Sequence, residues 1–505
     1  RFTTAVDKIV LNRFLGLPIF LFVMYLMFLL AINIGGALQP LFDVGSVALF
    51  VHGIQWIGYT LHFPDWLTIF LAQGLGGGIN TVLPLVPQIG MMYLFLSFLE
   101  DSGYMARAAF VMDRLMQALG LPGKSFVPLI VGFGCNVPSV MGARTLDAPR
   151  ERLMTIMMAP FMSCGARLAI FAVFAAAFFG QNGALAVFSL YMLGIVMAVL
   201  TGLMLKYTIM RGEATPFVME LPVYHVPHVK SLIIQTWQRL KGFVLRAGKV
   251  IIIVSIFLSA FNSFSLSGKI VDNINDSALA SVSRVITPVF KPIGVHEDNW
   301  QATVGLFTGA MAKEVVVGTL NTLYTAENIQ DEEFNPAEFN LGEELFSAVD
   351  ETWQSLKDTF SLSVLMNPIE ASKGDGEMGT GAMGVMDQKF GSAAAAYSYL
   401  IFVLLYVPCI SVMGAIARES SRGWMGFSIL WGLNIAYSLA TLFYQVASYS
   451  QHPTYSLVCI LAVILFNIVV IGLLRRARSR VDIELLATRK SVSSCCAAST
   501  TGDCH

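Results

Sequence analysis

The chain has 505 residues, of which 55% are apolar and only 13% are charged, and its mean hydropathy is +0.67. This composition excludes an ordinary soluble domain and is typical of a protein that crosses the membrane several times. The net charge of −1, without a basic face interleaved with aromatic side chains, gives no indication of nucleic-acid binding.

Apolar runs long enough to cross about 30 Å of hydrocarbon predict eight transmembrane helices. The runs are 15–36, 82–99, 153–179, 184–206, 246–264, 395–417, 425–447 and 455–474. The predicted fold is therefore an all-α polytopic membrane protein. Because the chain opens at Arg1 without an initiator Met, we expect it to continue a longer polypeptide at its N-terminus.

Lysine and arginine accumulate in loops on the cytoplasmic side of a membrane, and their distribution predicts the topology. The segment 37–81 has neither residue, and the segment 325–394 has 14 acidic residues against three lysines, so both are expected outside. The segments with a basic excess or several basic residues are 100–124, 143–152, 206–249 and 475–480. These four segments, and with them both termini, are expected in the cytoplasm.

Two apolar segments are too short, or wrongly flanked, to cross the membrane. Segment 125–142 has basic, cytoplasmic flanks on both sides, so it should enter the membrane and return to the same side. Segment 300–324 must likewise enter and return, from the external side, because otherwise the segments that follow it would lie on the wrong side of the membrane for their charges. Residues 82–206 then form a span, a re-entrant hairpin, a broken span and a span, and residues 246–447 repeat that order in the opposite orientation. Two such units related by a two-fold axis in the membrane plane are a common transporter plan, with the site at their interface.

The remaining segments complete the predicted organisation. Residues 15–81 hold the first span and an external segment, 207–245 form an amphipathic cytoplasmic connection, and 448–474 hold the last span. The tail 475–505 is basic at first and then contains cysteines and a terminal histidine, namely Cys495, Cys496, Cys504 and His505. Such a tail binds metal in some proteins, and surface thiols without a ligand are the alternative.

Helix-breaking residues interrupt the apolar sequence beside three cysteines. The motifs are Gly132-Phe133-Gly134-Cys135-Asn136-Val137-Pro138, Pro160-Phe161-Met162-Ser163-Cys164-Gly165-Ala166-Arg167 and Val407-Pro408-Cys409. Breaks of this kind free backbone groups that hydrocarbon cannot satisfy, so they persist where they line a protein-enclosed cavity. Sulfur ligands suit a soft or borderline metal cation. We therefore predict that Cys135, Cys164 and Cys409 converge on a metal pathway; the alternative is that each packs as a small hydrophobe.

Polar residues next to these breaks are candidate oxygen ligands. Asn136 and Ser163 flank the thiols, and their alternative role is to cap freed backbone groups. Glu314 lies in the second re-entrant segment and is a candidate ligand or proton acceptor, whereas the alternative is an ion pair with Lys313 that fixes the hairpin.

Glu100 and Asp101 end the second predicted span. Adjacent carboxylates there are candidates for a cytoplasmic vestibule that attracts cations. The alternative is a solvated helix end with Arg107 as its partner. The sequence has no CxxC pair and no H-E-x-x-H helix, and Ala118 stands where a phosphate loop ending in Gly123-Lys124-Ser125 needs glycine, so no enzyme is predicted within this chain.

Taken together, these motifs resemble those of the FeoB ferrous-iron transporters, especially the enterobacterial members. Glu100-Asp101-Ser102-Gly103-Tyr104-Met105-Ala106-Arg107 and Ala312-Lys313-Glu314-Val315-Val316-Val317-Gly318 also belong to the match, which covers essentially the whole chain. The resemblance implies a cytoplasmic GTPase domain, absent here, followed by a helical linker that ends in residues 1–14. It implies that residues 82–206 and 246–447 are two inverted Gate repeats.

By the same resemblance, Cys135, Cys164 and Cys409 line a route for Fe(II) across the bacterial inner membrane into the cytoplasm. GTP and Mg would bind only through the absent domain. The implied partners are the lipid bilayer, the protein's own GTPase domain and small cytoplasmic Feo accessory proteins, and a homo-oligomer is left open. Two other functions fit the fold: a Gate-type carrier for an organic solute such as a nucleoside, and a membrane anchor that conducts nothing.

Overall fold

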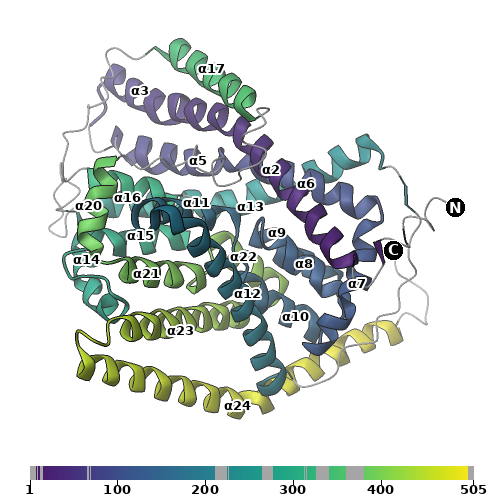
Figure 1. The fold of residues 1–505 in the computed structure, drawn as a ribbon. Helices are drawn as coiled ribbons and strands as arrows, with labels where there is room; N and C mark the ends of the chain where they lie inside the picture. Colours follow the sequence, from purple (N-terminus) through teal and green to yellow (C-terminus); the bar gives the residue numbers. More distant parts are fainter. Residues whose placement is uncertain are drawn as a thin grey trace.

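A computed structural model describes most of the chain. The described residues are 7, 10–11, 15–64, 67–68, 70–210, 224–225, 227–263, 277–311, 313, 315–325, 340–359 and 380–498. Within them every regular element is helical and no strand occurs, which confirms the predicted fold class. Figure 1 shows long helices lying side by side, with shorter, interrupted ones between them.

Seven helical stretches among the described residues are long and apolar enough to cross a membrane. They are Pro18–Leu61, Phe70–Asp101, Pro149–Phe179, Gly183–Thr208, Ala393–Glu419, Arg422–Ala447 and Pro453–Arg476. Each overlaps one predicted span. The remaining predicted span, 246–264, falls in α13 (Val229–Ser263), which is not one of the seven, so the count of eight stays a prediction.

The first helix is much longer than predicted. Helix α2 (Gly16–Ser46) continues through a π-helical turn, Val47–His52, into α3 (Gly53–Leu61), so the helix runs beyond residue 36, where the predicted span ends. The membrane boundary near residue 36 stays a prediction. The 44 residues of Pro18–Leu61 rise about 66 Å, roughly twice the hydrocarbon thickness. Pro40 lies inside α2 without ending it.

The extension of the first helix forms a layer with α17 (Leu341–Thr359). Helix α17 packs along α2, and Figure 1 shows it beside α3 at the top of the molecule. His52 Nδ1 lies 2.9 Å from the carboxylate of Glu344 and joins the two segments. The two segments predicted to be external are therefore in contact.

The first predicted unit contains two interrupted helices and then an unbroken one. Its helices are α6 (Leu85–Asp101), α7 (Tyr104–Ala118), α8 (Phe126–Val131), α9 (Asn136–Gly142), α10 (Pro149–Met158), α11 (Gly165–Phe174) and α12 (Gly183–Thr208). One interruption separates α8 from α9, and the other separates α10 from α11. Both fall at the glycine- and proline-containing motifs, because these residues disfavour helix interiors.

The second unit has the same order of elements. Apart from α17, which lies in its predicted external loop, the α-helices are α13 (Val229–Ser263), α14 (Ala278–Ile286), α15 (Trp300–Met311), α16 (Val315–Thr325), α20 (Thr380–Phe390), α21 (Ala393–Leu405), α22 (Ile410–Glu419) and α23 (Arg422–Ala447). Here the interruptions separate α15 from α16 and α21 from α22. The order hairpin, broken span and unbroken span thus occurs twice.

The half-helices of one unit pack against those of the other. Helix α9 packs on α22, and α11 packs on α16, so each unit contributes the second half of its hairpin and of its broken span. Buried aromatic rings, including Phe174 and Tyr399 with centroids 5.4 Å apart, also join the units. This reciprocal packing is what two units related by a two-fold axis produce; the axis itself stays a prediction.

Segments predicted to lie in the cytoplasm also meet. Arg150 donates hydrogen bonds to the carbonyl oxygens of Met210 (3.0 Å) and Gly120 (3.2 Å). The ammonium of Lys206 donates to the carbonyl oxygen of Ala118 at 3.0 Å. The grouping follows the charge pattern of the loops.

Three further helical elements lie outside the two units. They are η2 (Phe70–Gly76), α5 (Gly77–Val82) and α24 (Pro453–Ala498). Helix α24 contains the last predicted span and continues into the basic tail. Cys504 and His505 lie outside the described residues, as do the side chains of Cys495 and Cys496.

Candidate functional site

The three predicted thiols occupy the same position relative to their helices. Cys135, Cys164 and Cys409 are the N-cap residues of α9, α11 and α22, and each has an extended backbone conformation. A helix N-terminus presents free N–H groups and a positive dipole end, which favour a negative ligand such as a thiolate. Three half-helices therefore direct their N-termini at the sulfur-bearing residues.

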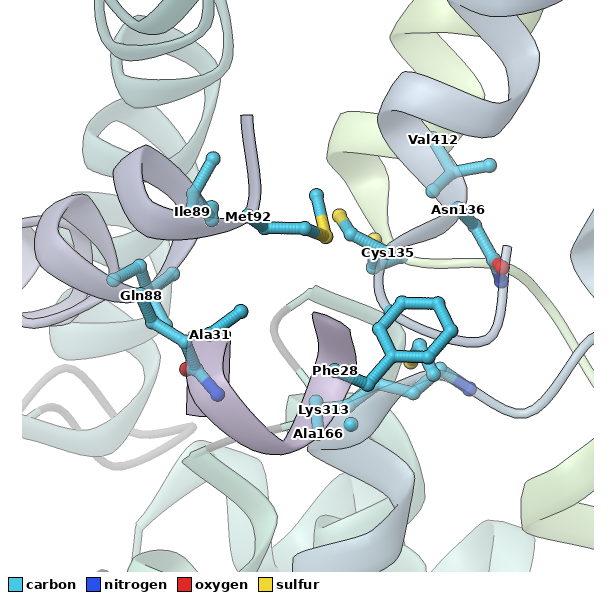
Figure 2. A pocket seen from close by; sticks show the side chains of 15 residues that line it. Phe28, Ala31, Gln88, Ile89, Met92, Cys135, Asn136, Ala166, Lys313 and Val412 are labelled. Carbon is cyan, nitrogen blue, oxygen red and sulfur yellow. The ribbon is translucent and has the colours of Figure 1, made fainter. Parts of the chain in front are cut away.

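These three residues line one cavity of about 80 Å³. The lining residues, shown in Figure 2, are Phe28, Ala31, Leu85, Gln88, Ile89, Met92, Gly134, Cys135, Asn136, Cys164, Gly165, Ala166, Lys313, Cys409 and Val412. They come from α2 and from both predicted units. The space is sufficient for several water molecules.

The three thiols line this cavity but do not form a complete metal-binding site. Among the described residues, no group of three or more His, Cys, Asp or Glu side chains is arranged so that it holds a metal ion. All three thiols are only partly buried. The cavity therefore brings the predicted residues together as an open set of donors.

Met92 also lines the cavity and is not among the residues predicted from the sequence. Figure 2 shows its side chain beside Cys135, so a thioether joins the thiols around the cavity. A Cβ on Gly134 would lie 2.5 Å from the Phe28 ring and 2.7 Å from the Met92 sulfur. Glycine at position 134 therefore allows the cavity to form. No local pattern in the sequence distinguishes Met92 from the other methionines.

Asn136 connects the two breaks of the first unit. With its amide nitrogen turned toward them, it donates hydrogen bonds to the carbonyl oxygens of Gly132 (2.8 Å) and Ala159 (3.3 Å). The N–H of Gly165 donates to the carbonyl oxygen of Gly134 at 3.2 Å. The amide of Asn136 thus satisfies backbone groups that the breaks free, which is the alternative role that the sequence left open.

Two buried cations satisfy other freed carbonyls. The guanidinium of Arg167, which is fully buried, donates to the carbonyl oxygens of Pro160 (3.0 Å) and Met162 (2.9 Å). The ammonium of Lys313 donates to the carbonyl oxygen of Val403 at 3.3 Å and lies 4.3 Å from the centroid of the Tyr406 ring. Positive charges at the C-terminal ends of α10 and α21 interact favourably with the negative ends of the helix dipoles.

Glu314 lies outside the described residues, so neither of its predicted roles is tested. In the sequence it directly precedes α16, as the three cysteines precede their half-helices. Ser163 is fully buried and does not line the cavity.

Glu100 and Asp101 do not belong to this cavity. Glu100 is paired with Arg239 of α13 at 2.7 Å, and Gln235 donates to Asp101 at 3.3 Å. The proposed partner Arg107 is instead fully buried and bound to Asp7 at 2.6 Å. The alternative in which Arg107 is the partner of this helix end is therefore not observed, since Arg239 and Gln235 of α13 bind it instead. The predicted cation-attracting vestibule stays a prediction.

Comparison with known proteins agrees with the motifs. The Fe(2+) transporter FeoB of Shigella flexneri is 99% identical over 505 residues, and that of Salmonella typhimurium is 94% identical; each match covers all of this chain and 65% of the relative. FeoB of Legionella pneumophila is 50% identical over 485 residues, 94% of this chain and 63% of the relative. The chain thus spans about two thirds of the length of these relatives. The predicted resemblance to FeoB is confirmed.

Two families match parts of the chain. The FeoB C-terminus family, described as ferrous iron transport protein B C terminus, matches residues 187–239. The Gate family, described as nucleoside recognition, matches residues 82–178 and 244–422, one segment in each predicted unit. No solved structure matches. The two segments that match the Gate family together comprise more than half of the residues of this chain. The chain, a multi-pass membrane protein, therefore belongs to the Gate family.

Proposed function

We propose that this chain is the membrane part of a ferrous-iron transporter and that Fe(II) passes through the cavity lined by Cys135, Cys164 and Cys409. The observation that supports this most directly is the common position of the three thiols, each at the N-terminus of a half-helix and all around one cavity. The curated relatives are named Fe(2+) transporters, which supports iron as the cargo.

The donor chemistry favours iron over harder cations. Thiolates and a thioether prefer soft or borderline metals, whereas Mg²⁺ and Ca²⁺ prefer oxygen ligands. Thiols that reach water through an open cavity can lose their protons when the metal binds. An open donor set also suits transport, because a cargo ion has to leave its site as well as occupy it.

The cavity argues against an organic solute. Pockets for drug-sized molecules have volumes of about 300–1,000 Å³, whereas this cavity has about 80 Å³. Few polar groups face it, chiefly those of Gln88, Asn136 and Lys313. A ribose or a base would need more hydrogen-bonding partners than these provide.

The remaining parts of the proposal concern the whole protein. We place both termini in the cytoplasm and the spans in the bacterial inner membrane, as the loop charges suggest. A GTPase domain that precedes residues 1–14 would bind GTP and Mg and bias the opening of the route, so this chain alone would not hydrolyse GTP. Small cytoplasmic Feo proteins and further copies of the protein are its proposed partners.

Iron uptake by the reconstituted full-length protein tests the proposal. Changing Cys135, Cys164 and Cys409 together to Ser should lower anaerobic uptake of radioactive Fe(II) into proteoliposomes at least about tenfold, because soft ligands are lost. Cys459→Ser is the matched control, because that thiol lies in α24 and does not line the cavity. Undiminished, selective uptake by the triple variant would refute the ligand role.

A further inference from the structure

An ion pair joins the two units at the far ends of two half-helices. Arg144, in the 3₁₀ turn Ala143–Thr145 that follows α9, forms a bidentate pair with Glu419, the last residue of α22, with Nε–Oε2 and Nη2–Oε1 distances of 2.5 Å. Arg152 also donates to the carbonyl oxygen of Glu419 at 3.2 Å. The Glu419 side chain is only 5% exposed, whereas that of Arg144 is 52% exposed.

The two helices that end at this pair begin at the thiol cavity. Helix α9 starts after Cys135, α22 starts after Cys409, and the two pack side by side. They therefore run in parallel from the cavity to the ion pair. Their lengths of 7 and 10 residues correspond to about 10 and 15 Å.

A second cavity, of about 130 Å³, lies along the same helices. Its lining residues are Val137, Met141, Gly242, Phe243, Ile410, Ser411, Gly414, Ala415, Arg418 and Glu419. Asn136 and Val412 line the first cavity, while Val137 and Ser411, adjacent in sequence to them, line the second. The first turns of α9 and α22 thus separate the two spaces.

The charges around the second cavity oppose a cation while the pair is closed. Arg144 neutralises Glu419, and Arg152 and Arg418 add positive charge at the same end. The guanidinium of Arg144 is charged at all ordinary pH values, and the hydrogen bonds that it donates to Glu419 raise its pKa further. A divalent cation is repelled by this arrangement, whereas an unpaired Glu419 carboxylate would attract it.

We propose that metal leaves the thiol cavity between α9 and α22 and that the Arg144–Glu419 pair closes this route. The inference rests on the proposed function, since it needs a cargo in the thiol cavity. Opening the pair would release the ends of both half-helices from one another and free a carboxylate at the exit. The segment 143–152, which contains Arg144 and Arg152, is one of those predicted to face the cytoplasm.

Thiol labelling tests the closure without requiring transport. The full-length protein would carry Cys459, Cys495, Cys496 and Cys504 changed to Ser, and a charged, membrane-impermeant maleimide would be added to inverted membrane vesicles. Arg144→Gln and Glu419→Gln should each raise the labelling rate of the cavity thiols about tenfold, because the closed end opens more often. The charge swap Arg144→Glu with Glu419→Arg should return the rate to near the original value.

Lys124→Gln is the matched control, because it removes a basic partner of the exposed Asp147, 3.6 Å away in the same group of loops, and should leave labelling unchanged. If Arg144→Gln fails to fold, Arg144→Lys, which keeps the charge and loses the bidentate geometry, should still increase labelling. Unchanged labelling in the folded variants, or an increase that the charge swap does not reverse, would overturn the closure. Iron uptake by the triple cysteine variant tests the proposed function, and thiol labelling tests the closure by the Arg144–Glu419 pair. Failure of one is therefore distinguishable from failure of the other.

Discussion

The backbone N–H of Gly165 donates a hydrogen bond to the carbonyl oxygen of Gly134, so the two breaks that carry Cys135 and Cys164 are bonded to each other directly. The backbone groups freed at a helix break need partners from side chains, water or other backbone groups. Here each break supplies a partner for the other, and the two cysteines are held at one cavity as a consequence. Backbone pairing between breaks therefore positions the thiols.

Gly134→Ala should block the cavity. The added Cβ would lie 2.5 Å from the Phe28 ring and 2.7 Å from the Met92 sulfur, so these side chains would have to move into the space beside the thiols. We expect Fe(II) uptake by the full-length protein to fall about tenfold or more, since overpacking of this kind costs roughly 1–3 kcal/mol. Gly426→Ala, where a Cβ meets no atom within 4 Å, should have no effect on uptake.

Asn136→Asp separates a capping role from a ligand role. The aspartate has no N–H to donate to the carbonyl oxygens of Gly132 and Ala159, and its charge would face them. We expect the free energy of unfolding to fall by about 2–4 kcal/mol, measured as a lower melting temperature in detergent. Asn340→Asp is the control, because that side chain accepts a hydrogen bond from the N–H of Gly342 and aspartate accepts it equally well. Unchanged stability with tighter metal binding would favour the ligand role.

Ala348→Glu should detach α17 from α2. Ala348 is completely buried on α17, and a carboxylate there would lose its hydration without gaining a partner. Hydrogen–deuterium exchange across 341–359 should increase at least about tenfold while exchange in α6 and α12 stays unchanged. Val349→Glu, at a site that is 55% exposed, should leave exchange near that of the parent protein. Equal protection in both variants would contradict the packing of α17.

Alkaline pH should loosen the packing around α7. Burial, with a smaller contribution from Tyr224, raises the pKa of Tyr104 to about 12 from its ordinary value of 10.0. The folded protein therefore holds this proton more tightly than the unfolded chain, and the contribution to stability is present below pH 10 and lost as the pH rises toward 12. The melting temperature should fall more between about pH 10 and 12 in the parent protein than in Tyr104→Phe. Equal pH dependence of the two proteins would disprove this account.

The positions of the helix breaks could be predicted from the sequence because their causes are local. Glycine and proline next to Cys135, Cys164 and Cys409 weaken helical hydrogen bonding within a few residues of themselves. The grouping of the loops could also be predicted from the sequence, since basic and acidic segments are recognised from their composition alone. The length of the first helix could not be predicted, because its extension beyond residue 36 packs against α17, which is some 300 residues away in the sequence.

The sequence by itself determined the membrane fold, the three sulfur-bearing breaks and the order of elements in two units, since hydropathy, charge and helix-breaking residues act over one turn or one span. Only the tertiary structure decided that Asn136 bonds freed carbonyls, that Glu100 is paired with α13, that Met92 joins the cavity, and that Arg144 binds Glu419. Each of these contacts joins residues from different helices. Which residues meet depends on how the helices pack, and local hydrogen bonding and hydropathy carry no information about that.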